Sequence, residues 1–188
     1  MDRLELATRR TDRLFQSDER SFEYVVALAK DDGSQFISRR ESAPEPPNYF
    51  LRTPHNDAKI ALTAFPEPPA KLRAIRKQIV TYAREDGVPL SFTLYLPPDY
   101  QPGQRLPTVL WAYPREYNDV DTAGQVSGSA NRFTSITGPS QLFFALRGYA
   151  VLDGATMPVV GDPKNVNDTF LEQIVASAKA AIEKAGVK

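Results

Sequence analysis

The sequence contains no cysteine, which excludes disulfide bonds, thiolate catalysis and cysteine-ligated metals. No apolar run approaches the roughly 18 residues needed to span a bilayer, and the N-terminal residues show no signal-peptide core. The 23 basic and 23 acidic side chains cancel, which argues against an electrostatic grip on nucleic acid or an anionic membrane. We therefore expect a soluble protein that binds neither nucleic acid nor membrane. The lack of cysteine leaves its compartment open.

The motif of a serine hydrolase is also missing. No Gly-x-Ser-x-Gly occurs, and no histidine follows His55. Because the histidine of such enzymes comes after the serine, we interpret His55 as an ordinary loop residue. Ser127-Gly128-Ser129 has no nearby base, so neither serine is expected to be a nucleophile. Residues 119–124 partly match a calcium loop but fail at two ligand positions, so we expect no metal and no cofactor.

What is present is a globular composition, 41% hydrophobic and 24% charged over 188 residues, enough for one domain or parts of two. The first 65 residues predict strands without helices, because short aromatic and β-branched runs alternate with turn residues. Asp31-Asp32-Gly33 predicts a hairpin, since glycine accepts a positive φ. A weak echo relates residues 4–15 to residues 49–62 at about 45 residues, the period of a β-propeller blade. The predicted strands are residues 4–8, 12–15, 23–29, 35–40, 48–52 and 59–64.

Residues 66–69, Pro-Glu-Pro-Pro, predict a boundary, because proline cannot join a strand ladder and stiffens a connector. Strands then alternate with helices, beginning with a hairpin turn at Glu85-Asp86-Gly87. A short helix is expected over residues 140–147, stopped by Gly148. Such alternation in a parallel sheet calls for a further strand after the last helix. The predicted strands are residues 79–84, 91–96, 107–113 and 149–153.

The last predicted helix is the clearest one. Asn167 or Asp168 can cap its start, and Gly186 ends it. Its apolar positions form a stripe that is expected to lie on the sheet. The stripe comprises Phe170, Leu171, Ile174, Val175, Ala178, Ala181 and Ile182.

The strand over residues 107–113 stops abruptly at Tyr113-Pro114. Because strand residues alternate between faces, Leu110 and Ala112 are expected on one face, with Trp111 and Tyr113 on the other. A tyrosine at a strand end is often an amphipathic cap on the core. In a serine-hydrolase sheet, however, the loop after the third strand supplies an oxyanion donor. From the pattern alone, both interpretations of Tyr113 stay open.

Several motifs, taken in order and spacing, resemble the prolyl oligopeptidase family of serine peptidases, and within it the glutamyl endopeptidase branch. The resemblance covers about residues 4–188. The motifs that carry the family are Asp86-Gly87-Val88-Pro89-Leu90 and Leu94-Tyr95-Leu96-Pro97-Pro98-Asp99-Tyr100. Those that carry the branch are Ser38-Arg39-Arg40-Glu41-Ser42, Glu45-Pro46-Pro47-Asn48-Tyr49-Phe50, Trp111-Ala112-Tyr113-Pro114-Arg115-Glu116, Ala123-Gly124-Gln125-Val126 and Gly148-Tyr149-Ala150-Val151-Leu152.

The resemblance implies the last blade or so of a β-propeller over residues 1–69. Residues 70–188 would form the first half of a doubly wound α/β-hydrolase peptidase domain, truncated before the nucleophile elbow. Tyr113 then matches the oxyanion donor of the intact enzyme, which stabilises the tetrahedral intermediate. Nucleophile, acid and base are expected beyond residue 188, so the chain alone should not hydrolyse peptides.

The branch suggests a peptide substrate cut after acidic residues, whose carboxylate Arg39, Arg40 or Arg115 could face, although surface charge also accounts for each arginine. The alternative is a stand-alone, non-catalytic β-rich interaction module, which the missing triad would suit. On the fragment hypothesis, the strand over residues 107–113 is an exposed apolar edge. We therefore expect self-association through that edge.

Overall fold

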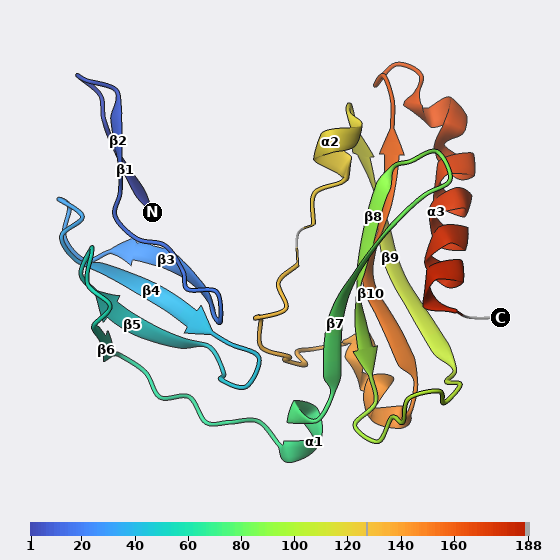
Figure 1. The fold of residues 1–188 in the computed structure, drawn as a ribbon, viewed down its shortest axis with the longest axis horizontal. Helices are drawn as coiled ribbons and strands as arrows, with labels where there is room; N and C mark the ends of the chain where they lie inside the picture. The colour runs from blue at the N-terminus through green and yellow to red at the C-terminus, as the bar shows by residue number, and fades with distance from the viewer. Residues whose placement is uncertain (127, 187–188) are drawn as a thin grey trace. The chain divides into compact units, whose positions relative to one another are not determined.

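A computed structural model of the chain describes residues 1–126 and 128–186. It divides into two compact units (Figure 1). Unit 1 comprises Met1–Pro69 with Asn131–Thr134, and unit 2 comprises the other described residues. The division falls directly after the proline-rich stretch 66–69. Ser127, one of the two serines considered above, lies outside the described residues.

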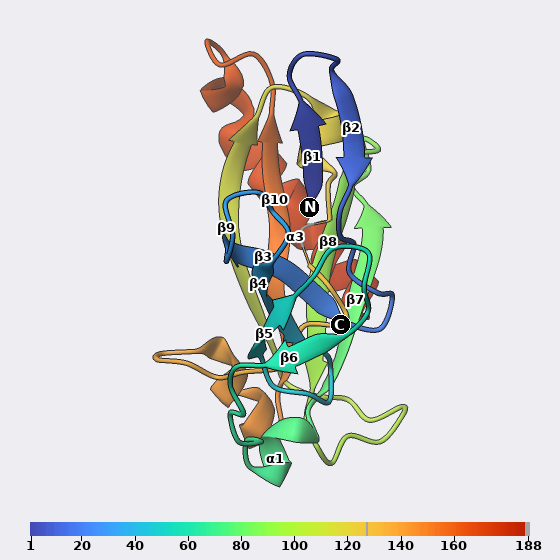
Figure 2. The ribbon, with the colours of Figure 1, turned by 90° about the vertical axis from the view of Figure 1, so that its left-hand side faces the viewer.

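Unit 1 consists of antiparallel strands joined in chain order. A hairpin pairs β1 (Asp2–Glu5) with β2 (Arg10–Arg13). A four-stranded meander follows, shown face on in Figure 2. Its strands are β3 (Phe22–Leu28), β4 (Phe36–Glu41), β5 (Asn48–Arg52) and β6 (Lys59–Ala61). The predicted strands are confirmed with shifted ends, and Gly33 takes the expected positive φ of 73° in the β3–β4 turn.

The core of unit 1 is mostly polar. Phe36 is its only buried hydrophobic residue, and its ring meets that of Phe15 at 5.2 Å between centroids. Beside it, the buried Glu23 carboxylate accepts two hydrogen bonds from Arg52, at 2.8 and 2.6 Å, and one from Ser38 at 2.6 Å. Because β3, β4 and β5 each supply one of these three polar side chains, the ion pair joins the meander across its strands.

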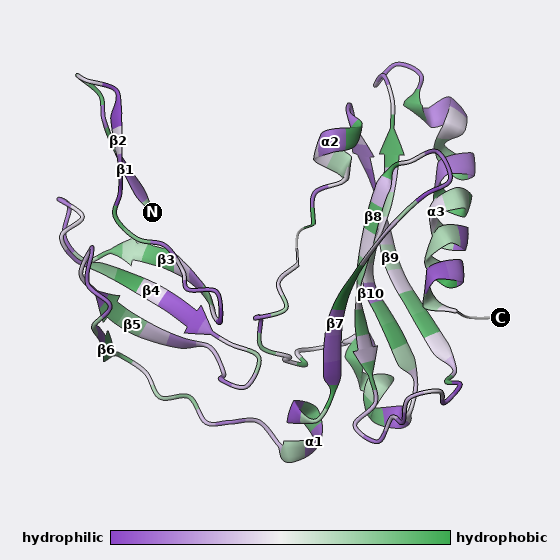
Figure 3. Cartoon of the chain, viewed as in Figure 1, coloured by the Kyte–Doolittle hydropathy of each residue, from purple (hydrophilic) through white to green (hydrophobic). Residues whose placement is uncertain are grey.

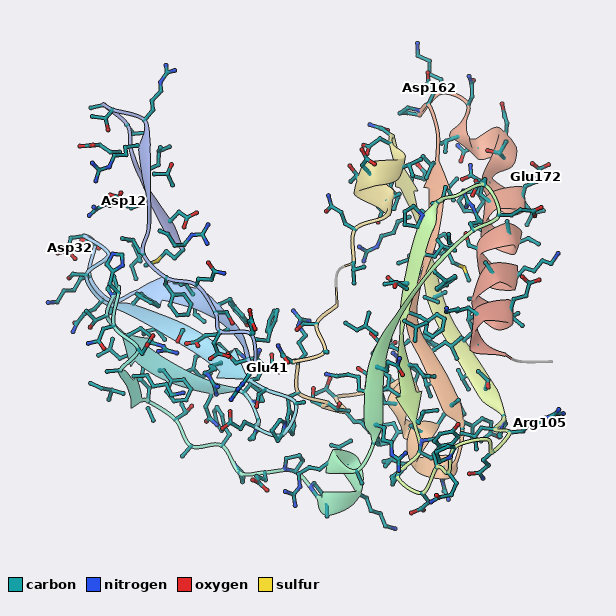
Figure 4. The ribbon with its side chains drawn as sticks, in the orientation of Figure 1. Asp12, Asp32, Glu41, Arg105, Asp162 and Glu172 are labelled. Atoms are coloured by element: carbon teal, nitrogen blue, oxygen red, sulfur yellow. The ribbon has the colours of Figure 1, made fainter. Side chains whose placement is uncertain are left out.

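The segment Asn131–Thr134 belongs to unit 1, although it lies far along the chain from the meander. The Phe133 backbone N–H donates to Glu41 at 3.0 Å, and the Asn131 amide donates to the Glu19 carbonyl at 2.8 Å. Glu41, labelled in Figure 4, is buried and also accepts from Arg39 at 2.9 Å. Both carboxylate oxygens of Glu41 are therefore engaged.

Unit 2 is built on a mixed four-stranded sheet. Its spatial order is β7 (Arg76–Ala83), β8 (Pro89–Leu96), β10 (Ala150–Val160) and β9 (Thr108–Tyr117). Only β9 and β10 run parallel. Figure 3 shows apolar stretches along β9 and β10, whereas the beginning of β7 is hydrophilic. The helix α3 (Phe170–Ala185) covers one face.

The sheet of unit 2 has an apolar cluster on each face. Phe92, Leu152, Ala155 and Ala181 form the cluster beneath α3. Ile75, Leu142, Ala145 and Val151 form the other, under the short helical turns α1 (Ala70–Arg73), η1 (Gln141–Phe143) and η2 (Ala145–Arg147). The remaining turns are α2 (Val120–Ala123) and η3 (Val166–Thr169). No helix among residues 1–126 and 128–186 is both long and apolar enough to cross a bilayer.

Strand β9 does not stop at Tyr113-Pro114, as the sequence suggested, but continues to Tyr117. It lies at the edge of the described sheet, and β10 is its one neighbour. An edge strand uses its backbone donors on one side only, so the missing N–H of Pro114 costs little. As a consequence, Arg115 lies in the strand rather than in a loop.

Strand β10 is also longer than predicted, because it passes through a glycine and a proline. The register against β9 shifts between Asp153 and Ala155, where Gly154 takes a φ of 60°. This is a β-bulge, which bends a strand without ending it. Pairing with β8 covers only Val151–Asp153, so Pro158 lies where β10 no longer has β8 beside it.

The helix predictions need two corrections. Residues 140–147 form two 3-10 turns rather than an α-helix, although Gly148 ends them with the expected positive φ of 89°. The α3 N-cap is Thr169, whose side chain makes no capping hydrogen bond, and the expected caps Asn167 and Asp168 lie before it in η3. Gly186 ends α3 as expected, with a φ of 68°.

The apolar stripe predicted on α3 is covered only in part. Ala181 is fully buried, whereas Leu171, Val175 and Ile182 are exposed. Ser177, also fully buried, lies one turn before Ala181, so the covered face is centred on a polar residue. The hydrogen bonds of that face, described below, explain why the helix turns it toward the sheet.

Candidate functional site

The candidate site is a cavity of about 300 Å³ at the carboxyl ends of β9 and β10. Open α/β sheets bind ligands beyond the carboxyl ends of their parallel strands. Both strands and the α2 region contribute to the wall. The lining residues are Tyr113, Arg115, Tyr117, Thr122, Ala123, Gln125, Gly154, Ala155, Thr156, Met157 and Pro158.

A second cavity of similar volume, about 320 Å³, lies at the amino ends of the same two strands. Thr108 and Ala150, which begin β9 and β10, line it together with Arg105. Figure 4 shows Arg105 and Asp162, which follows β10, at opposite ends of this sheet. The cavity at the carboxyl ends is the stronger candidate on fold grounds, and it holds two of the residues predicted from the sequence.

Tyr113 lies on β9 and is 82% exposed. Leu110 and Ala112 pack toward the cluster under α3, and Trp111 is exposed. The predicted alternation of faces along the strand is therefore confirmed. A phenol held on a strand at the rim of a cavity can donate a hydrogen bond to an oxygen that enters the cavity.

Arg115 lies two residues further along β9 and lines the same cavity. Its register partner on β10 is Pro158, while Tyr113 pairs with Thr156. Among the described residues, no carboxylate forms an ion pair with Arg115. The cavity therefore combines a hydroxyl donor with an uncompensated guanidinium, a set suited to a ligand that carries a carboxylate.

The α2 wall of the cavity is fixed by local contacts. The Asp119 carboxylate caps α2, accepting from the Thr122 backbone N–H at 2.7 Å and from its hydroxyl at 2.9 Å. These hydrogen bonds lower the pKa of Asp119. At the other end of α2, a Cβ on Gly124 would lie 2.9 Å from the Pro89 ring, so only glycine fits there without a shift. The stretch 119–124 is thus a capped turn, and the described residues contain no cluster of potential metal ligands.

The other sequence candidates lie elsewhere. Arg39, in unit 1, donates to Glu41 and contacts the Tyr24 ring, and these partners raise its pKa against the effect of burial. Arg40 pairs with Glu45 at 2.6 Å. His55 lies in the β5–β6 connection with a positive φ of 56°. Tyr113 and Arg115 are therefore the predicted residues that unit 2 brings together.

Sequence reasoning missed the β10 part of the wall, from Gly154 to Pro158. Glycine and proline within six residues normally signal the end of a strand. The α2 part carried a signal, because Ala123-Gly124-Gln125 belongs to a motif already singled out. Its position in the fold could not be read from that motif.

Comparisons with known proteins bear on the whole chain. No family model matches it. A protein of Oryza sativa subsp. japonica named "Probable glutamyl endopeptidase, chloroplastic" is 39% identical over 196 residues, covering 98% of this chain and 21% of its own length. Its namesake in Arabidopsis thaliana is 38% identical, covering 98% of this chain and 20% of its own length. The chain thus spans about a fifth of the length of these relatives.

Among solved structures, oligopeptidase B from Trypanosoma brucei superposes with a TM-score of 0.56 at 14% identity. The match covers 97% of this chain and 26% of that chain. At this identity, the likeness concerns the fold alone.

Proposed function

The chain belongs to the prolyl oligopeptidase family of serine peptidases, and from that premise we propose that it forms part of an enzyme that cleaves peptide bonds by acyl transfer. Unit 1 would be the last blade of a β-propeller, with β1 and β2 finishing the blade before it. Unit 2 would be the first half of an α/β-hydrolase domain. The observation that carries this proposal is the cavity at the carboxyl ends of β9 and β10, which Tyr113 and Arg115 both line.

Tyr113 would donate its phenolic hydrogen to the oxyanion of the tetrahedral intermediate. Such a donor is effective because it is already in place when charge develops on the oxygen. A tyrosine on a strand is held by the sheet, and the exposed ring of Tyr113 leaves its hydroxyl accessible to a substrate. The nucleophile would come from outside these 188 residues, which contain no Gly-x-Ser-x-Gly.

Arg115 would receive the acidic side chain of the substrate. Arg39 and Arg40, which the sequence also suggested, already pair with Glu41 and Glu45. Arg115 lines the cavity beside Tyr113 and, among the described residues, has no acidic partner. A substrate carboxylate would supply that partner, and cleavage after acidic residues follows.

The isolated chain should hydrolyse neither p-nitrophenyl acetate nor fluorogenic peptides that contain glutamate, because an oxyanion donor without nucleophile and base is not a catalyst. Purified protein and a fluorophosphonate probe test this expectation. Turnover that survives repurification, together with a labelled serine, would overturn it.

In an active enzyme that carries this segment, Tyr113→Phe should lower kcat by about 10²–10³-fold with little change in KM. Tyr100→Phe, a matched change at the amino-end cavity, serves as the control. An unchanged kcat in Tyr113→Phe would return this tyrosine to a structural role.

Arg115→Gln in the same enzyme should lower kcat/KM for a glutamate substrate about tenfold, the cost of one exposed charged hydrogen bond. The glutamine analogue of the substrate should be unaffected. Arg105→Gln, at the amino-end cavity, is the control. Equal losses for both substrates would remove Arg115 from acidic recognition.

We propose self-association as a second property of the isolated chain. The edge strand β9 exposes Trp111, and α3 exposes Leu171 and Val175, so apolar surface is available on both sides of the sheet. Light scattering after size exclusion tests this. A monomer with one sharp, concentration-independent urea transition would favour the interaction-module alternative.

A further inference from the structure

Strand β10 loses its neighbour halfway along. It pairs with β8 over Val151–Asp153 only, yet it stays paired with β9 as far as Val160. After the bulge, the Gly161 N–H bonds to the Tyr117 carbonyl of β9 at 3.1 Å. Backbone groups alternate in direction along a strand, so those of residues 156, 158 and 160 face away from β9. Buried backbone groups need partners, and β8 does not supply them here.

Side chains supply partners where the β8–β10 ladder is missing. For the Ser91 backbone of β8, the partner is the Thr156 hydroxyl, which accepts from the Ser91 N–H at 2.8 Å and donates to the Ser91 carbonyl at 3.2 Å. The Gln173 amide accepts from the Val160 N–H at 2.9 Å and donates to the Val160 carbonyl at 3.0 Å. Gln173 thus makes the pair of bonds that a neighbouring strand would make.

The backbone of residue 158 also has a side chain as its hydrogen-bond partner. This residue is a proline, so it has no N–H to satisfy, and its carbonyl accepts from Arg84 at 3.1 Å. Arg84 is only 4% exposed. Its guanidinium also donates to the side-chain and main-chain oxygens of Gln173, at 3.1 and 3.3 Å, and to the Ser177 hydroxyl at 3.1 Å. The bidentate pair with Asp86, at 2.8 Å for each bond, completes its set and lowers the pKa of Asp86.

We name Arg84, Gln173 and Ser177 the β10 clamp, and we propose that Arg84 and Gln173 are positioning residues for the candidate site. Neither lines the cavity. They act through Thr156–Val160, the strand segment that forms one wall and pairs in register with Tyr113 and Arg115. The link to catalysis rests on the proposed function.

Side chains of the clamp, rather than a neighbouring strand, hold this wall of the cavity in place. A continuous β8–β10 ladder would hold β10 in line with β8. The bulge at Gly154 ends the pairing of β10 with β8, and the clamp holds the part of β10 after the bulge in one position. Held in this way, the wall opposite Tyr113 can take a position that a regular sheet would not give it.

The test uses Gln173→Met, which keeps the side-chain length and removes both hydrogen bonds to Val160, together with those to Arg84 and Thr169. Lys179→Met, on the exposed side of α3, is the matched control. Hydrogen exchange of the 188-residue chain, followed by mass spectrometry, should show at least tenfold faster exchange in residues 155–161 and 113–117. Residues 93–96 of β8, which face β10 before the bulge, should be unchanged, and Lys179→Met should change none of these segments.

Gln173→Glu separates positioning from general stability. It keeps the acceptor for the Val160 N–H and for Arg84 but loses the donor to the Val160 carbonyl, so its exchange should fall between wild type and Gln173→Met. Exchange that rises equally in residues 93–96 would mean that Gln173 only stabilises unit 2, and unchanged exchange at 155–161 would remove the clamp altogether. These readouts involve no peptide, so a failed peptidase hypothesis would leave them intact.

Discussion

Glu23 in unit 1 and Leu152 in unit 2 are both almost sealed from solvent, yet they are held in opposite ways. The Glu23 side chain is 1% exposed and pairs with Arg52. Leu152 is also 1% exposed and packs among Phe92, Ala155 and Ala181. A buried ion pair is expensive to desolvate and costly to break on one side, whereas an apolar cluster loses stability with each methylene removed. The two units should therefore respond to different mutations.

Removing one partner of the ion pair should have the largest effect. Arg52→Met leaves the Glu23 carboxylate buried without its bidentate partner and should destabilise unit 1 by about 3–5 kcal/mol. Hydrogen exchange in β3–β5 measures this loss. The fluorescence of Trp111, the only tryptophan, follows the unfolding of unit 2, and that transition should be unchanged.

Arg10→Met, at an exposed pair with Asp12, is the matched control and should have little effect. The double variant Glu23→Met with Arg52→Met should recover most of the loss, because neither charge of the pair is left buried and Arg40, 3.8 Å from Glu23 in the wild type, keeps its pair with Glu45. If the double variant is as unstable as Arg52→Met alone, the polar core does not hold unit 1 in the way inferred.

Leu152→Ala should have the next largest effect, with the pattern reversed. A cavity in the α3-side cluster should cost about 2–5 kcal/mol and lower the Trp111-detected urea midpoint, while exchange in β3–β5 stays as in wild type. Leu171→Ala, at a side chain 73% exposed, is the control and should change little. Loss of protection in both units from Leu152→Ala would show that they unfold together.

Gly124→Ala tests a contact in unit 2 that is steric rather than apolar or ionic. The backbone at Gly124, with φ −79° and ψ −2°, accepts alanine, but the new Cβ would press on Pro89. We expect a loss of about 1–3 kcal/mol from overpacking, in place of the usual gain when glycine becomes alanine.

Gly161→Ala is the control for that substitution, because its Cβ would meet Val166 at an ordinary 3.6 Å. Adding Pro89→Ala to Gly124→Ala should restore part of the stability, because it removes the contacts with Cγ and Cδ at 2.9 and 3.2 Å but keeps Cβ at 3.0 Å. A Gly124→Ala protein as stable as wild type would show that α2 can move away from Pro89 without cost.

The smallest expected effect concerns the buried hydroxyl of Tyr82 in unit 2. Burial raises the pKa of Tyr82 to about 12, and its buried hydroxyl has no hydrogen-bond partner among the described residues. Because the folded pKa exceeds the unfolded value, the stability linked to this group is complete below pH 10 and is lost as pH rises toward 12. Tyr82→Phe should remove that alkaline loss and leave stability at pH 7 equal or up to about 1 kcal/mol higher.

Urea melts at pH 7, 10 and 11.5 measure this difference, with Tyr113→Phe as the exposed control. A Tyr82→Phe protein that loses as much stability at pH 11.5 as wild type would assign the alkaline sensitivity to another group.

Local turn chemistry predicted much of this fold. Gly33 gave the position of the β3–β4 hairpin, and Gly148 and Gly186 gave the ends of helical segments, because each takes a positive φ that other residues avoid. The proline-rich stretch before Ala70 likewise marked the division between the units. These signals work because they are properties of single residues.

The second halves of β9 and β10 could not be predicted in the same way. Pro114 and Pro158 are tolerated because of which neighbours each strand lacks, and sequence alone does not give strand order. The same limit applies to the site. Tyr113 was found through a family resemblance, whereas Thr156 and Pro158 enter the cavity wall only through register with β9.

The β10 clamp also has a consequence in time. Arg84 bonds to partners 74, 89 and 93 residues later in the chain. At a synthesis rate of roughly 5–20 residues per second, the arginine is added to the chain about 5–20 s before Ser177. For most of that interval, Asp86 is the only hydrogen-bond partner of Arg84 that the chain contains. If the clamp also closes last when the finished chain refolds, damage to it should hasten unfolding far more than it delays folding.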